Sequence, residues 1–286
     1  MIETEGRSPG DALDDNTTDA EQAQPGESSP PDCPPDDSRK SSERSFFNEA
    51  AQTDPRGSVR QVYDLAQRSR VFYREALLDR CEGRSVLEYG CGLGSHAFSL
   101  ADAGARRVVG IDISDESICR ACDRIGESRA PDALCFEVMD AEAMDFEDNT
   151  FDLVCGSSIL HHLDLERSLA ELTRVMHPEG EAIFYEPLGH NPAINCFRRL
   201  TPRFRTEDER PLTRKDLRHV EGAFERAEFR YFHMLSLFSL PLLKTPLFPH
   251  VRNALERLDQ TLLDATPMLG RMAWVVVMIL SGPRSR

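Results

Sequence analysis

The stretch VLEYGCGLGSHAF, residues 86–98, places three glycines within five positions, after an apolar run and before a segment of helical periodicity. Glycine has no Cβ, so such a turn can adopt positive φ and admit a ligand against its main chain. The flanks SVLEY and SHAFSLADAG are typical of a buried strand and of a helix. The stretch therefore predicts a ligand-binding turn between a strand and a helix.

Two carboxylates follow at the ends of the next strand-like runs: RVVGID ends at Asp112, and ALCFEVMD ends at Asp140. In a nicotinamide site the glycines follow G-x-G-x-x-G, and an acid about 20 residues further on binds the ribose. The first two glycines and Asp112 fit this pattern, but Ser95 stands at the third glycine position. The glycines are spaced one place tighter, as acid-x-Gly-x-Gly-x-Gly over residues 88–94. The turn alone leaves two classes of cofactor open.

Strand-like and helix-like runs alternate after a helical region over residues 45–81. Strands are expected at 85–89, 107–112, 133–140, 151–158 and 181–187, and helices at 95–103, 114–125, 165–176 and around 213–229. Later residues predict strands at 229–238 and 274–280 with a helix at 252–265 between them. Residues 239–250, with three prolines, favour a cap or loop packed on the fold. The alternation predicts a parallel sheet whose carboxyl ends share one edge, with helices on both faces.

Taken together, these segments resemble a class I S-adenosylmethionine-dependent methyltransferase, of the type 11 subgroup that includes quinone and small-molecule methyltransferases. VLEYGCGLG resembles the first motif of that family, VVGIDIS its second-strand acid, and VMDAEAMDFEDNTFDLV its third-strand acid. CGSSILHHLDLERSLAELTRVMHPEGEAIFYEP resembles the strand, helix and strand that follow. The resemblance covers residues 84–187. It implies an α/β, Rossmann-like doubly wound sheet, mostly parallel with an antiparallel last strand and helices on both faces.

The resemblance implies S-adenosyl-L-methionine as the cofactor and assigns residues to its amino-acid end. Gly90, Cys91 and Gly92 would line this end through backbone groups. Glu88 would position the ammonium, directly or through water. Ser157, at the end of the fourth strand, would face the methionine moiety.

The nucleoside end is assigned to four further residues by the same resemblance. Asp112 would accept hydrogen bonds from both ribose hydroxyls, which suits a carboxylate because it only accepts. Ile113 would pack on the adenine face. Asp140 would accept from the adenine amino group, and the backbone N–H of Ala141 would donate to a ring nitrogen.

Methyl transfer from a sulfonium requires alignment of donor and acceptor, and sometimes a base that takes a proton from the acceptor. His162 and His190 follow the fourth and fifth strands and are the candidate catalytic bases, with a structural role as the alternative. Phe72 and Tyr73 are candidates for a lid over the cofactor. The implied acceptor is a small or lipid-like molecule, and no metal site is expected.

An arginine patch follows the fifth strand, in the stretch where substrate walls are usually built. It could meet a carboxylate or phosphate of the acceptor, or pair with acids nearby in the sequence. Its members are Arg198, Arg199, Arg203 and Arg205, and the acids are Glu207, Asp208 and Glu209.

Composition divides the 286-residue chain into a polar segment and a globular part. Residues 1–44 hold twelve acidic and four basic side chains with few aliphatic ones, which predicts a disordered acidic tail. Residues 45–286 would form the methyltransferase domain, with a helical lid at 45–83, a cofactor-binding core at 84–187, and a substrate-side insert, cap and closing strands at 188–286. The tail and the net charge of −15 argue against a nucleic-acid partner.

The remaining sequence signals bear on location and on other functions. The start of the chain lacks the apolar run of a signal peptide, and the apolar stretches elsewhere are too short to span a membrane. A cytoplasmic protein is therefore expected, and peripheral contact with a membrane is disfavoured. Cys119 and Cys122 form a CxxC within a helical pattern, where a structural role is favoured. Two other functions stay open: a nicotinamide-linked oxidoreductase, disfavoured by Ser95 and the late strands, and a non-catalytic adenosylmethionine-binding regulatory module.

Overall fold

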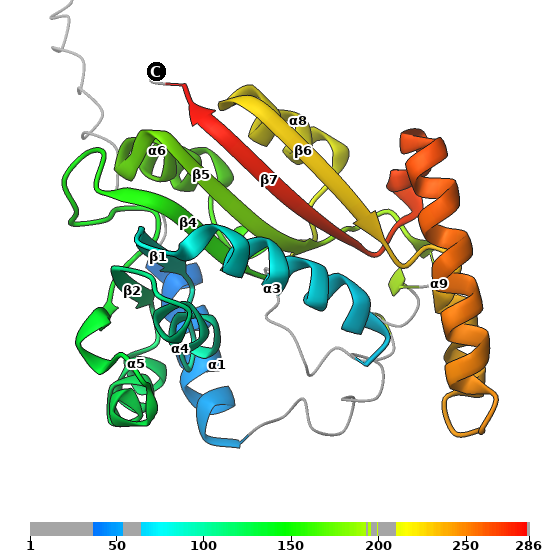
Figure 1. Cartoon of the computed structure of the whole chain (residues 1–286), viewed down its shortest axis with the longest axis horizontal. Coiled ribbons are helices and arrows are strands. Elements are labelled where there is room, and N and C mark those ends of the chain that lie inside the picture. Colours follow the sequence, from blue (N-terminus) through cyan, green and yellow to red (C-terminus); the bar gives the residue numbers. More distant parts are fainter. Residues whose placement is uncertain (1–36, 54–63, 193, 196–198, 200–209, 285–286) are drawn as a thin grey trace, which may run out of the picture. The chain divides into compact units, whose positions relative to one another are not determined.

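The computed structural model describes residues 37–53, 64–192, 194–195, 199 and 210–284. Its centre is a seven-stranded sheet (Figure 1). The strands are β1 (Ser85–Tyr89), β2 (Arg107–Asp112), β3 (Leu134–Val138), β4 (Phe151–Ser157), β5 (Met176–Pro187), β6 (Phe224–Phe232) and β7 (Val275–Pro283). The α-helices are α1 (Asp37–Thr53), α3 (Gln67–Cys81), α4 (Ser95–Asp102), α5 (Asp115–Asp123), α6 (Leu165–Val175), α8 (Arg214–Gly222) and α9 (Phe248–Ala265). Single 3-10 turns are η2 (Asp64–Ala66), η3 (Ile125–Glu127), η4 (Pro131–Ala133), η5 (Leu160–His162), η7 (Ser236–Leu242) and η8 (Pro267–Met272).

The strand order is β3-β2-β1-β4-β5-β7-β6. β1 pairs in parallel with β2 on one side and with β4 on the other, so the direction of winding reverses at β1. β7 runs antiparallel to both β5 and β6. The predicted fold is therefore confirmed, including the antiparallel last strand. Open sheets of this kind bind ligands beyond the carboxyl ends of the strands where the winding reverses, here the ends of β1 and β4.

The sheet is covered by helices on both faces, because successive strand residues point to opposite sides. Val86 packs with α3, α4 and α5 on one face, and its neighbour Leu87 packs with α6 and α8 on the other (Figure 1). All five residues of β1 are buried. A strand buried on both faces reads as a continuous apolar run, which explains why the central strands are visible in the sequence.

The amino-terminal part differs from the expected boundaries. α1 begins at Asp37, so residues 37–44, predicted as the end of a disordered tail, are helical and that boundary is wrong. Residues 1–36 lie outside the described part of the chain, where the tail prediction is untested. α3 packs its buried side against the sheet through Tyr73 and Leu77.

The carboxyl-terminal part corrects one helix and one strand. α8 ends at Gly222 and β6 spans Phe224–Phe232, so residues 224–228, predicted as helix, are strand. The strand expected at 229–238 therefore begins five residues earlier and ends at Phe232. The physical reason is pairing with β7, which extends from Phe224 opposite Pro283 to Phe232 opposite Val275. The predicted cap segment forms η7 and the first turn of α9.

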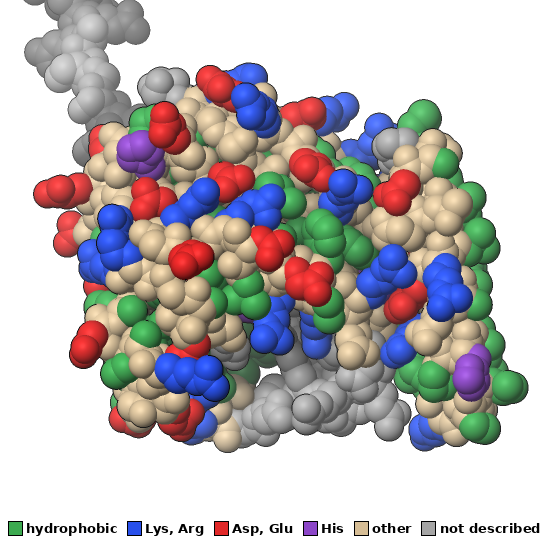
Figure 2. Space-filling view, viewed as in Figure 1, with side chains coloured by type: hydrophobic (Ala, Val, Ile, Leu, Met, Phe, Trp, Pro, Cys, Tyr) green, Lys and Arg blue, Asp and Glu red, His purple; other side chains and the backbone are tan. Residues whose placement is uncertain are grey.

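The face of the molecule in Figure 2 carries basic and acidic side chains interspersed over the helices. Opposite charges pair in places, as between Arg80 and Glu181 at 3.4 Å. Within the described ranges, no helix is both long and apolar enough to cross a membrane.

Candidate functional site

A cavity of about 300 Å³ lies at the carboxyl ends of the central strands, where the winding reverses. The residues predicted to bind a cofactor or act as a base that line this cavity are Gly90, Gly92, Asp112, Ile113, Asp140, Ala141, Ser157 and His162. They come from four separate segments of the sequence, which the parallel sheet brings to one edge. The cavity is also lined by the inner side of α1 and by Met139, Ser158 and Ile159.

The glycine-rich turn has the conformation that its sequence predicts. Gly90 and Gly92 have φ of +64° and +52°, in the left-handed region that disfavours other residues. A Cβ at Gly90 would lie 2.6 Å from Ile159 Cδ1, whereas a Cβ at Gly92 would meet no atom within 4 Å. The turn is thus tightly packed at its first glycine and bare at its second, where the main chain borders the cavity.

Asp112 connects this turn to the end of β2. Its carboxylate accepts a hydrogen bond from Gly92 N at 2.8 Å and another from Ser114 N at 2.9 Å. Burial raises the pKa of Asp112, while the two backbone donors and the nearby His162 oppose this rise. A carboxylate has about four lone-pair sites, so two bonds leave acceptor capacity for a ligand.

Asp140 follows β3, the neighbour of β2 in the sheet, and also lines the cavity. One carboxylate oxygen accepts from Glu142 N at 2.9 Å, and the other pairs with Lys40 Nζ. Lys40 also lies 3.1 Å from Glu142 Oε2. Ala141, between the two acids, is buried, and its carbonyl accepts from Tyr89 Oη.

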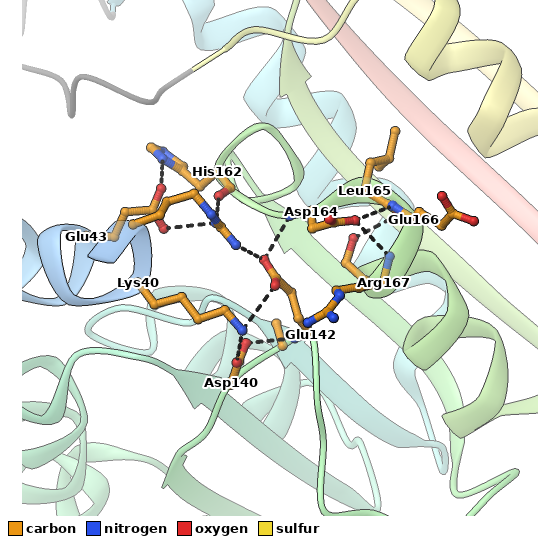
Figure 3. Close-up of polar contacts among 12 residues, drawn as sticks. Lys40, Glu43, Asp140, Glu142, His162, Asp164, Leu165, Glu166 and Arg167 are labelled. Carbon is orange, nitrogen blue, oxygen red and sulfur yellow. Dashed lines mark hydrogen bonds and ion pairs between the residues drawn. The ribbon is translucent and has the colours of Figure 1, made fainter. Parts of the chain in front are cut away.

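α1 covers this wall through charged contacts that Figure 3 shows at close range. Arg39 donates to Glu142 and to the backbone carbonyl of His162. Lys40 and Glu43 point from α1 toward Asp140 and His162, respectively. α1 therefore lines the cavity along its length, and its residues 45–53 fall within the helical lid predicted at 45–83. Its first two turns, which make these charged contacts, were missed because the sequence pattern assigned them to the tail. Three of the four basic residues in the expected acidic tail lie in this helix, followed by Phe46 and Phe47, and this pattern was the available signal.

Phe72 and Tyr73, the predicted lid residues, pack elsewhere. Tyr73 is fully buried beneath the sheet edge, with its ring beside Tyr185 and His96. The Phe72 ring packs on Phe232. Neither residue lines the cavity, so that prediction is wrong.

The two adjacent histidines after β4 have different surroundings. His161 Nδ1 lies 2.7 Å from Glu186 Oε2, and the other Glu186 oxygen accepts from the backbone N–H groups of Ile159 and Leu160. This buried pair fixes the loop that follows β4. His162 lines the cavity, and its Nδ1 lies 3.3 Å from Glu43 Oε1 without a hydrogen bond.

Three predicted site residues lie away from the cavity wall. Glu88 is buried and accepts from Ala97 N at 2.8 Å, so it caps the start of α4, and burial raises its pKa to about 8. Cys91 is buried behind the turn, where burial raises the pKa of its thiol. His190 lines a different cavity. Direct contact of these three residues with cofactor or acceptor remains a prediction.

The arginine patch lies mostly outside the described residues. Arg199 is described and exposed, whereas its other members and the neighbouring acids at 207–209 are not. In the described ranges, no group of three or more histidine, cysteine or acidic side chains is placed to hold a metal ion. Cys119 and Cys122 are exposed free cysteines on α5.

Comparison with known proteins bears on the central part of the chain. Residues 87–184, from β1 to β5, match the model of a family described as a methyltransferase domain. This match covers about a third of the 286 residues. The predicted resemblance and the predicted cofactor, S-adenosylmethionine, are confirmed.

Individual relatives agree with this assignment. The 27-O-demethylrifamycin SV methyltransferase of Amycolatopsis mediterranei (strain S699) is 35% identical over 99 residues, which are 34% of this chain and 36% of that protein. Methyltransferase GfsG of Streptomyces halstedii is 25% identical over 198 residues, 69% of this chain and 70% of that protein. The aligned part of this chain thus spans about a third of the first relative and over two thirds of the second.

The fold has counterparts among solved structures. Geranyl diphosphate C-methyltransferase from Streptomyces coelicolor A3(2), solved with Mg²⁺, geranyl diphosphate and S-adenosyl-L-homocysteine, superposes with a TM-score of 0.57. The match covers 86% of this chain and 98% of that chain at 13% sequence identity. At this identity the likeness concerns the fold alone.

Proposed function

We propose that this protein transfers a methyl group from S-adenosylmethionine to a small-molecule or lipid-like acceptor. The observation that carries the proposal is the cavity at the glycine turn, because it brings Gly92, Asp112, Asp140 and Ser157 to one place. The family match supports the same chemistry. The rifamycin relative, whose name states a small-molecule acceptor, supports this class of acceptor.

The residues present fit the cofactor by two features of the cavity. The bare main chain at Gly92 leaves space where a Cβ would otherwise stand. The carboxylate of Asp112 retains lone pairs beyond its two backbone bonds. A bare turn beside a carboxylate suits an amino-acid end followed by a ribose, and neither feature requires a pyrophosphate.

In this proposal each wall of the cavity holds one part of the cofactor. Asp112 accepts hydrogen bonds from the ribose hydroxyls, Asp140 accepts from the adenine amino group, and Ile113 packs on the ring. The glycine turn and Ser157 border the amino-acid end. When bound, the cofactor supplies an activated methyl group on a positively charged sulfur. The contribution of the protein is to orient this group and the acceptor, and α1 covers the cavity and excludes water.

His162 is the candidate base, because it is the predicted base that lines the cavity and its Nδ1 lacks a hydrogen-bond partner. An acceptor proton would pass to the imidazole of His162 if the acceptor must lose one. His162→Gln should then lower kcat and change its pH profile while leaving the affinity for S-adenosylhomocysteine within about twofold. An unchanged pH profile would assign His162 a structural role.

Calorimetric titration of the full chain tests the cofactor, with S-adenosylmethionine, S-adenosylhomocysteine and NAD as separate ligands. We expect both sulfur compounds to bind and NAD not to bind. Binding of NAD alone would refute the proposal. Transfer of labelled methyl groups into a metabolite extract then tests catalysis. Tight binding without any transfer would favour a non-catalytic regulatory module instead.

A further inference from the structure

A second cavity, of about 110 Å³, lies between the loop after β5, the start of α8, strand β6 and η8. Its lining has no residue in common with the cavity at the glycine turn. It contains His190, a histidine that the proposed methyl transfer does not use. The side chains that line this second cavity indicate which class of ligand it could bind.

The lining is basic, on a chain whose net charge is −15. Of the described residues, His190, Arg214 and Arg271 line the cavity, and none of the described carboxylates does. Among the residues that the structure describes, neither arginine forms a hydrogen bond or an ion pair. A guanidinium stays charged at all physiological pH values. Two guanidinium groups that have no partner among the described residues therefore line one small hollow.

The histidine supplies an independent observation. Its Nδ1 atom is buried and has no hydrogen-bond partner. A buried polar atom without a partner is costly, at about 1–3 kcal/mol, and is rare in native proteins. The residue that carries this unsatisfied atom lies in the wall of the cavity.

Tyr231 of β6 adds a hydroxyl to the same lining. Burial raises the pKa of Tyr231, and so does the charge of Glu221, while Arg214 is near enough to oppose this rise. The phenol is therefore a neutral donor beside a guanidinium. The ring is held in place by η8, because a Cβ on Gly270 would lie 2.5 Å from it.

Size and apolar surface narrow the class of ligand. A volume of about 110 Å³ is roughly a third of that of the cofactor cavity, which suits one phosphate or carboxylate group rather than a nucleotide. Leu188 and Leu217 line the inner side and are buried. Met268 lines the cavity too and is 75% exposed, so its side chain offers apolar surface to a ligand beside the basic groups.

We propose that this second cavity binds the phosphate or carboxylate group of a small organic molecule through Arg214, Arg271 and His190, with an apolar part of that molecule on Met268. Paired guanidinium groups are the side chains best suited to such oxyanions, because each offers two parallel N–H donors. The site is independent of the proposed methyl transfer, so its test needs no turnover.

Calorimetry on the full chain at low ionic strength tests the proposal, with inorganic phosphate, acetate and n-hexyl phosphate as probes. Phosphate and acetate distinguish the two oxyanions. We expect one site for at least one of them and about tenfold or greater weakening in Arg214→Gln and in Arg271→Gln. Arg218→Gln is the matched control, since Arg218 is exposed on α8 but does not line the cavity. Binding by both variants as strong as wild type, or no binding of any probe, would overturn the proposal.

Comparing n-hexyl phosphate with inorganic phosphate tests whether an apolar part of the ligand contacts Met268. n-Hexyl phosphate should bind more tightly than inorganic phosphate, and Met268→Ser should remove this gain while leaving inorganic phosphate binding within about twofold. Equal affinities of the two phosphates for the wild-type protein would show that Met268 has no part in the site. All the substituted side chains are exposed, so loss of folding is not expected, and thermal unfolding of each variant checks this.

Discussion

Replacing Asp112 is the sharpest perturbation of the cofactor cavity, because this carboxylate has both a structural and a ligand-binding part. It accepts from Gly92 N at 2.8 Å and from Ser114 N at 2.9 Å, and it faces the cavity. Asp112→Ala removes all of these bonds. Asp112→Asn keeps one carbonyl oxygen but replaces the other acceptor by an amide that donates, so the two variants separate the roles.

The expected magnitudes follow from the hydrogen bonds. Two backbone donors that lose a charged acceptor cost about 2–4 kcal/mol of the free energy of unfolding in the alanine variant, and less in the asparagine variant. Loss of the ribose contacts costs a further ~1–3 kcal/mol of binding free energy, so affinity for S-adenosylhomocysteine should fall at least about tenfold in Asp112→Ala. Because burial raises the pKa of Asp112, wild-type affinity should weaken on acidification sooner than a solvated aspartate would predict.

Calorimetry with S-adenosylhomocysteine measures the affinity, and urea unfolding measures the stability of each variant. Glu116→Gln serves as the control, since it removes one negative charge from α5 without lining the cavity. The control should bind within about twofold of wild type. An Asp112→Ala protein that is folded and binds with unchanged affinity would show that the cofactor does not lie on this carboxylate.

Three further predictions concern residues around the same cavity. Lys40→Met frees one carboxylate oxygen of Asp140 from its ion pair, and a partly exposed ion pair contributes about 0.2–1 kcal/mol. Calorimetry should therefore show that the variant binds S-adenosylhomocysteine up to about fivefold more tightly than wild type. A weaker affinity would mean that Lys40 helps to hold the cofactor. Gly90→Ala and Gly92→Ala both place a residue with a Cβ in the left-handed region, at a cost of about 1–2 kcal/mol. The new Cβ at residue 90 also meets Ile159, so Gly90→Ala should lower the melting temperature more than Gly92→Ala does. A larger decrease in Gly92→Ala would contradict the geometry of the turn. Since burial raises the pKa of Glu88 from 4.5 to about 8, the native state binds the extra proton across that window and its stability falls as pH rises through it. The stability of Glu88→Gln relative to wild type, from urea unfolding, should therefore be greater at about pH 9 than at about pH 5, and a constant difference would show that Glu88 does not titrate in this way.

The strands of the central sheet were predictable because they are buried on both faces and therefore appear as apolar runs. β2 spans Arg107–Asp112, as expected from RVVGID. The residues on one wall were predictable for a related reason: strands that run in parallel deliver their carboxyl ends to the same edge, so Asp112 and Asp140 had to lie near the glycine turn.

The contribution of α1 was not predictable in the same way. Its contacts join residues about a hundred positions apart in sequence, as Lys40 and Asp140 show, and no local pattern specifies such pairs. The first half of β6, which was predicted as helix, was missed for a different reason. β6 is an edge strand with Arg226, Glu228 and Arg230 at alternate positions on a largely exposed face, so it lacks the apolar run of a central strand. Charges on an edge strand also prevent pairing with other chains.

The position of β7 has a consequence for synthesis of the protein. β7 lies between β5 and β6, and it pairs with both along their length. During translation, residues 275–283 leave the ribosome about ninety residues after β5, and until then β5 has an open edge and β6 has no partner. The nascent chain must therefore keep two unpaired strands from joining each other or neighbouring polypeptides. Inserting the last strand between them is the step that closes the sheet.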